Sequence, residues 1–208
     1  MDEGADTTRK NILSAEQLQE LLRPGKEFET KLQGQVSSFT PGSANLIIMR
    51  VGDYNASAHA LLEYFGRTRT PGVYVTINKP YTDLLKGISS PPENVRYVDS
   101  ITALTGRGTP DLPHVTYLDS PLALVEMNLA ITDELKKVAS NLKFLVLDSI
   151  STLLVYNSPP SVEKFCHTVI AKNRNEGVVG IFLMIESEEH RSVVDTLAQF
   201  VDNVVFIH

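Results

Sequence analysis

The residues that could bind a ligand begin at 50–57, RVGDYNAS, which follow an apolar run and precede a helical pattern. Phosphate-binding loops have this layout: glycines let backbone N–H groups close around the phosphates, a lysine reaches the β- and γ-phosphates, and a hydroxyl binds magnesium. Aligned with that pattern, Arg50 and Asn55 replace the two glycines, and Ala56 replaces the lysine. Only the hydroxyl of Ser57 is kept. Taken alone, the stretch fits a plain strand, loop and helix better than a nucleotide site.

Two further residues of the loop bear on the same question. Gly52 provides one flexible position, whereas Asp53 places a negative charge where a triphosphate would lie. A carboxylate near a helix N-terminus can itself satisfy the free N–H groups and the helix dipole. We therefore expect Asp53, Asn55 or water to satisfy these N–H groups. We also expect side chains of the loop, including Tyr54, to fill or narrow the space that phosphates occupy in a working loop.

The stretch 143–156, KFLVLDSISTLLVY, provides the second candidate. Asp148 follows an apolar run, as does the aspartate that holds magnesium, directly or through water, in nucleotide-hydrolysing proteins. The alternative interpretation is an aspartate that caps a turn after a buried strand. Ligands of open parallel sheets bind outside the carboxyl ends of the strands. We therefore expect Asp148 to lie at such an end, close to the 50–57 loop.

The residues that would activate water are missing. Asn78 and Lys79 follow the apolar run at 73–77, where an ATPase places a carboxylate as a base or water acceptor, and neither can act as one. The acidic cluster at 186–190 has one histidine but no second histidine or cysteine at ligand spacing, and acidic residues are favoured at helix starts anyway. We therefore expect no catalytic residue and no metal centre.

Alternating strands and helices must position these residues. Apolar runs predict seven strands, at 46–51, 73–77, 95–98, 115–118, 144–147, 178–185 and 204–207. Helical patterns lie at 57–65, 81–88, 121–140, 162–176 and 192–200. Several strands are continuously apolar, as expected where helices cover both faces of a parallel sheet. The pattern predicts an α/β fold with a predominantly parallel central sheet flanked by helices.

Composition limits the domain organisation and the class of function. We expect residues 1–35 to be a polar tail plus a short N-terminal helix at 14–25, and 36–208 to be one α/β domain. The formal net charge of −6 argues against a protein that grips nucleic-acid backbone. The single cysteine, Cys166, excludes an intrachain disulfide. The acidic N-terminus is unlike a signal peptide, and no apolar stretch reaches the ~20 residues that span a bilayer. These features predict a cytoplasmic protein without a membrane span.

In their order along the chain, five stretches resemble the ATPase domain of the RecA superfamily, of the KaiC-like type abundant in archaea. They lie within about residues 36–208, at 45–65, 72–88, 144–154, 167–190 and 197–207. The resemblance implies a RecA-like P-loop NTPase fold, a three-layer sandwich. It matches Ser57 with the magnesium-binding hydroxyl and Asp148 with the Walker B aspartate. Gly52, Asp53, Asn55 and Ala56 then lie in a degenerate Walker A motif, and the six residues form a vestigial nucleotide and magnesium site.

The resemblance leaves three functions open. With no lysine in the loop and no carboxylate at 78–79, the first is a non-catalytic pseudo-ATPase that needs no cofactor. It would regulate or scaffold through protein contacts, as a homo-oligomer or paired with an active RecA/KaiC-like relative. The second is a nucleotide-binding sensor, in which Ser57 and Asp148 hold ATP and magnesium weakly with little or no hydrolysis. The third is a DNA-associated recombinase paralogue, against which the acidic charge argues.

Overall fold

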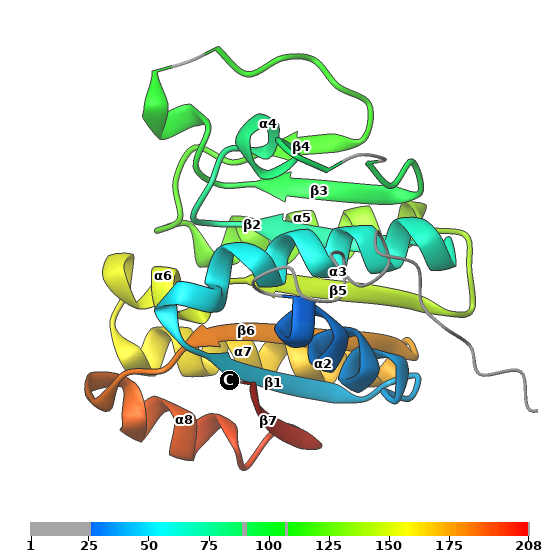
Figure 1. Ribbon diagram of the computed structural model, residues 1–208. Helices are drawn as coiled ribbons and strands as arrows, with labels where there is room; N and C mark the ends of the chain where they lie inside the picture. The colour runs from blue at the N-terminus through cyan, green and yellow to red at the C-terminus, as the bar shows by residue number, and fades with distance from the viewer. Residues whose placement is uncertain (1–25, 89–90, 107, 208) are drawn as a thin grey trace, which may run out of the picture.

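The computed structural model describes residues 26–88, 91–106 and 108–207, which form a seven-stranded sheet in the order β4-β3-β2-β5-β6-β1-β7 (Figure 1). The strands are β1 (Ala44–Met49), β2 (Gly72–Thr76), β3 (Val95–Asp99), β4 (Val115–Tyr117), β5 (Lys143–Asp148), β6 (Val178–Ile185) and β7 (Asn203–Ile207). Every pair of neighbours is parallel, so all carboxyl ends lie along the same edge of the sheet. The predicted fold class is confirmed, with each of the seven predicted strands present.

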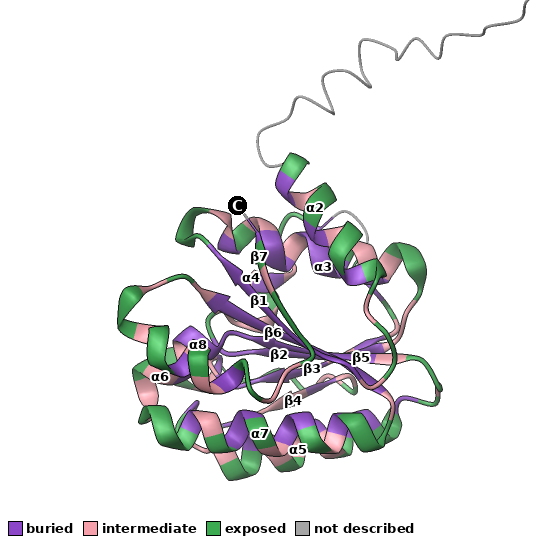
Figure 2. Cartoon of the chain, turned by 90° about the horizontal axis from the view of Figure 1, so that it is seen from below, coloured by how far each residue is buried: buried purple, intermediate pink, exposed green. Residues whose placement is uncertain are grey.

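Helices cover both faces of the sheet (Figure 2). One face carries α2 (Lys26–Ser37), α3 (Tyr54–Thr68) and α4 (Tyr81–Leu84); the other carries α5 (Leu124–Lys137), α6 (Ile150–Tyr156), α7 (Pro159–Asn175) and α8 (Arg191–Leu197). The five inner strands β3, β2, β5, β6 and β1 contribute to both layers: in β1, Leu46 and Ile48 pack beneath the second group, and Ile47 and Met49 beneath the first. This two-sided burial explains why the strands are continuously apolar.

Helix α2 was not predicted from the sequence, and neither was α6. α2 buries Phe28, Leu32 and Val36, which recur every four residues and therefore lie on one helix face against α3. The rest of α2 is polar, so its apolar stripe is too narrow to stand out in the sequence. α2 crosses the boundary that the sequence analysis placed after residue 35. The helix expected at 14–25 lies outside the described residues.

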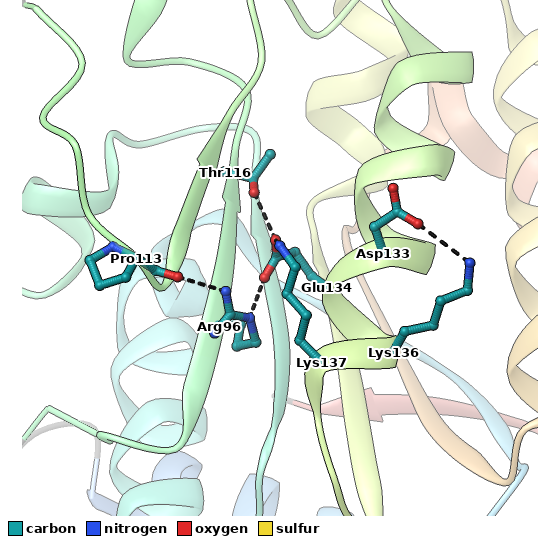
Figure 3. Close-up of polar contacts among 7 residues, drawn as sticks. All are labelled: Arg96, Pro113, Thr116, Asp133, Glu134, Lys136 and Lys137. Carbon is teal, nitrogen blue, oxygen red and sulfur yellow. Dashed lines mark hydrogen bonds and ion pairs between the residues drawn. The ribbon is translucent and has the colours of Figure 1, made fainter.

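A buried carboxylate on α5 links β3 and β4, the last two strands at one side of the sheet, to the helix layer (Figure 3). Glu134 accepts hydrogen bonds from Thr116 Oγ1 of β4 at 2.8 Å and from Lys137 Nζ at 2.5 Å, and it also pairs with Arg96 of β3. Arg96 in turn donates to the Pro113 carbonyl at 2.7 Å. Burial acts to raise the pKa of Glu134, but the donors Lys137, Arg96 and Thr116 together hold that pKa below its ordinary value.

Candidate functional site

The candidate site lies where the carboxyl ends of β2 and β5 meet the N-terminus of α3. Asp148 is the last residue of β5, and its register partner in β2 is Thr76. The next residue, Ile77, donates its backbone N–H to the Asp148 carbonyl at 2.8 Å. Tyr54, the first residue of α3, reaches Asp148 with its side chain. The structure therefore places Asp148 at a strand end beside the 50–57 loop, which agrees with the geometry expected from the sequence.

Two tyrosine hydroxyls take up both oxygens of the Asp148 carboxylate. Tyr54 donates to Oδ1, and Tyr74 of β2 donates to Oδ2 at 2.6 Å. Asp148 is only 2% exposed. Burial raises its pKa above the ordinary value, while the hydrogen bonds from Tyr54 and Tyr74 and the charge of Lys79 act in the opposite direction. The Asp148 carboxylate is therefore shielded from solvent, and both of its oxygens are hydrogen-bonded within the protein.

The two tyrosines are fixed as hydrogen-bond donors. Burial raises the pKa of both hydroxyls, and the nearby charge of Asp148 raises it further. Hydrogen bonds of Tyr54 with Asn78 and Ser149 act the other way but do not reverse the direction. Both phenols are therefore neutral and can donate to Asp148 at any physiological pH.

The loop itself differs from the expected arrangement at its helix end. A 3₁₀ turn, Val51–Asp53, leads directly into α3, which begins at Tyr54 rather than at the predicted residue 57. The Asp53 side chain makes no capping hydrogen bond, so the expected carboxylate cap is wrong for this residue. The backbone turn supplies a partner instead, since the Tyr54 N–H donates to the Val51 carbonyl, and the Asp53 N–H before it donates to the Arg50 carbonyl at 3.0 Å. A Cβ built at Gly52 would meet nothing within 4 Å, so this turn has no steric need for glycine.

The remaining loop residues also make internal contacts. The buried Ser57 donates its hydroxyl to the Tyr54 carbonyl at 2.6 Å, within the first turn of α3. Asn55 Oδ1 accepts from Lys79 Nζ at 2.7 Å, which ties the loop to the segment after β2. Ala56 is half-buried and packs against the core on the α3 side of the sheet.

Tyr74 was not predicted from the sequence as a partner of Asp148. A tyrosine inside an otherwise apolar strand, GVYVT, was the available signal, because a buried phenol usually finds a hydrogen-bond partner. The identity of that partner depends on the pairing of β2 with β5, which are separated by about seventy residues of chain and pair only in the folded sheet.

The described ranges contain neither a cluster of metal-ligating side chains nor a membrane-spanning helix. No group of three or more histidine, cysteine, aspartate or glutamate side chains there is arranged to hold a metal ion. In the acidic cluster, Ser187 Oγ accepts from the Glu189 N–H at 3.3 Å and Glu188 pairs with Arg191, so these residues start a helical segment. Among residues 26–88, 91–106 and 108–207, no helix is long and apolar enough to cross a membrane.

Comparison with solved structures defines the class as a KaiC-like, RecA-type fold. The chain is similar to the KaiC-like protein PH0186 from the hyperthermophilic archaeon Pyrococcus horikoshii, with 16% identity, a TM-score of 0.59, and coverage of 81% of this chain and 72% of that one. It is also similar to the uncharacterized protein PH0321 of Pyrococcus horikoshii, a structure in complex with an unknown peptide. For this second structure the identity is 14% and the TM-score 0.62, with 85% of this chain and 82% of that one covered.

The chain belongs to a family of unknown function (DUF7504), whose profile matches residues 43–207. No curated protein shows significant sequence similarity to it. The matched range contains β1 to β7 and the three residues of the site, Tyr54, Tyr74 and Asp148, while α2 precedes it.

Proposed function

We propose that this chain is a pseudo-ATPase: a non-catalytic RecA/KaiC-like module with a degenerate Walker A loop that regulates or scaffolds through protein contacts. The observation that supports this proposal best is the hydrogen bond from Tyr54 to Asp148. Tyr54 belongs to the segment that would have to enclose phosphate, and instead it reaches the aspartate that would hold magnesium.

The arrangement does not fit a magnesium–nucleotide complex bound in the usual way. Magnesium needs carboxylate oxygens free of competing donors, whereas both oxygens of Asp148 accept phenol O–H groups in a buried setting. The Ser57 hydroxyl is engaged with a backbone carbonyl. The Ala56 side chain carries no positive charge that could bind phosphate. Nucleotide entry would require Tyr54 to leave Asp148.

Exposed apolar side chains support a function that works through contacts with other proteins. Three apolar side chains at helical spacing, Leu122, Val125 and Leu129, are exposed on or just before α5, with exposed fractions of 62%, 76% and 58%. Val155 of α6 is also exposed, at 77%. Clustered exposed apolar side chains are typical of interaction surfaces. Self-association or pairing with a RecA/KaiC-like relative is the form of contact that we propose.

A second candidate, the nucleotide-binding sensor, is supported by Lys79. Its ammonium lies 2.7 Å from Asn55 Oδ1, so a lysine does reach the loop, although it comes from the segment after β2. In a sensor, displacement of Tyr54 would free Asp148 for magnesium, and Lys79 would contact phosphate in place of the missing loop lysine.

Calorimetric titration of ATP–magnesium into the full chain separates these candidates. For the pseudo-ATPase we expect no binding at ligand concentrations up to millimolar, no phosphate release, and the same result for Lys79→Met. Low-micromolar binding that is lost in Lys79→Met and kept in the control Lys86→Met would favour the sensor. Phosphate release that disappears in Asp148→Asn would contradict both. Self-association is tested by a mass measurement in solution. The measurement is repeated with Val125→Ser, which replaces one of the three exposed apolar side chains on or just before α5.

A further inference from the structure

A second hollow lies over β3 and the start of the edge strand β4, on the α4 face of the sheet, and takes no part in the Asp148 site. Its volume is about 310 Å³. Tyr81 and Leu85 line it from α4 and the turn that follows, Tyr97 lines it from β3, and His114 lines it just before β4. The segment Pro91–Glu93, which precedes β3, completes the lining. The size is at the small end of ligand pockets and suits one side chain rather than a nucleotide.

Three aromatic rings form one side of this hollow in fixed mutual orientations. The ring of Tyr81 lies edge-to-face with Tyr97, with centroids 4.7 Å apart, and with His114 at 5.6 Å. A hydrogen bond of 2.7 Å joins Tyr81 Oη to His114 Nε2. The backbone N–H of Tyr81 also donates to the buried carboxylate of Asp99 at 2.7 Å, which holds the start of α4 over β3. The aromatic wall is therefore pre-organised.

Tyr97 adds a polar group that has no use within the described structure. Its side chain is 1% exposed, and its hydroxyl has no hydrogen-bond partner among the residues described. Burial raises the pKa of Tyr97, so the hydroxyl is a neutral phenol. By contrast, the buried hydroxyls of Tyr54 and Tyr74 both find Asp148. A buried hydroxyl without a partner is costly, and a ligand in the hollow that Tyr97 lines can supply one.

The charged side chains around the hollow indicate which kind of ligand it favours. Glu93 is exposed and provides the carboxylate of the lining, beside the apolar surfaces of Leu85, Pro91 and Pro92. A neighbouring hollow of about 350 Å³ shares Pro91–Glu93, but Arg69 borders it and disfavours a cation there. A carboxylate next to aromatic rings is the surrounding that favours a cation, and the planar guanidinium both stacks on such rings and donates several hydrogen bonds.

We propose that this hollow binds a single arginine side chain of a partner protein. The guanidinium would stack on the partly exposed ring of Tyr81, donate to Tyr97 Oη and pair with Glu93, with the apolar stem along the prolines. The inference rests on the proposed function in one respect, that the chain acts through protein contacts. The cavity itself can be tested with a small molecule.

The test is an NMR titration of the full chain, labelled on tyrosine rings, with Nα-acetyl-L-arginine amide. We expect saturable shifts of the Tyr81 and Tyr97 rings. Removal of one hydrogen bond or one ion pair, in Tyr97→Phe or Glu93→Gln, should weaken binding about fivefold. Two matched controls outside the hollow, Tyr64→Phe and Glu63→Gln on α3, should bind as the wild type does. Equal binding of acetyl-norleucine amide, preference for acetyl-glutamate amide, or absence of any ring shift would overturn the proposal.

The thermal stability of Tyr97→Phe provides an independent readout. Because the hydroxyl has no partner among the described residues, this variant should melt at the same temperature as the wild type or higher. A clearly lower melting temperature would mean that the hydroxyl is already bonded within the protein, which would remove the basis of the proposal. The outcome is separate from that of the nucleotide titration: arginine binding together with tight ATP binding would contradict only the pseudo-ATPase.

Discussion

Asp148 is a buried carboxylate whose oxygens are satisfied from two elements, by Tyr54 at the start of α3 and by Tyr74 in β2. Each hydroxyl compensates part of the cost of burying the carboxylate. The same two bonds join β5 to its neighbour β2 and to the helix above. A group that resembles a ligand-binding aspartate in the sequence therefore has a structural task in the fold.

Tyr54→Phe tests this task with the smallest change available. It removes the donor to Asp148 Oδ1 and keeps the ring, so a buried acceptor is left without its partner. We expect the free energy of unfolding in urea to fall by about 1–3 kcal/mol. Tyr64→Phe, on the same helix, should change it by less than about 0.5 kcal/mol. If the two variants are equally stable, Asp148 has another partner and the closed site is not held by Tyr54.

For single residues, the sequence predicted that Asp148 lies near the 50–57 loop, but it did not predict which hydrogen bonds Asp148 accepts. The motif order placed Asp148 beside residues 50–57, because the carboxyl ends of parallel strands share an edge. The Tyr74 contact depends on the register of β2 against β5, which no local pattern encodes. The expected cap by Asp53 was wrong because the 3₁₀ turn moves the start of α3 forward to Tyr54.

Between elements, the attachment of β3 and β4 to the helix layer depends on Glu134 of α5. Its carboxylate is 1% exposed and joins Arg96 of β3 to Thr116 of β4, beneath the same strands whose other face carries the aromatic hollow. A paired carboxylate with a lowered pKa gives stability that is present above its unfolded-state pKa and lost as the pH falls through its folded-state pKa. The attachment of β3 and β4 should therefore weaken in acid.

Glu134→Gln should remove this pH dependence. At pH 7 we expect a loss of about 1–3 kcal/mol, because charge-assisted hydrogen bonds become neutral ones. The difference from the wild type should shrink as the pH falls below the ordinary glutamate pKa of 4.5. The control is Asp133→Asn, the exposed neighbour that faces Lys136 at 3.4 Å (Figure 3), which should cost less than about 0.5 kcal/mol at every pH. A constant difference from pH 7 to pH 3 would contradict the assignment of the charge.

Strands and helices were easier to find in the sequence when more of their residues are apolar and buried. The inner strands stood out because both of their faces are covered, which leaves continuous apolar runs. The outermost strands β4 and β7 are less buried and stood out through short apolar runs of their own. α6 was missed because its residues, ISTLLVY, continue the apolar run of β5 after only two polar residues. α2 was missed for the opposite reason, since three apolar residues in twelve give a weak signal.

For the whole molecule, the open question is whether α2 is part of the cooperative unit. The family profile begins at residue 43, after α2 has ended. Yet α2 lies along α3 and adds Phe28, Leu32 and Val36 to the same core layer as the inward residues of β1 (Figure 2). Leu32 is 0% exposed, so its burial matches that of the residues in the central strands.

Leu32→Ala decides this question. Deletion of a fully buried leucine side chain typically costs about 2–5 kcal/mol, and if α2 belongs to the unit, the single unfolding transition of the whole chain should move by that amount. Leu142→Ala is the matched control, because Leu142 is 49% exposed between α5 and β5 and should change the free energy by less than about 0.5 kcal/mol. The measurement is urea unfolding followed by far-ultraviolet circular dichroism. An unmoved main transition with a separate early loss of helical signal would show that α2 docks on the domain without sharing its folding.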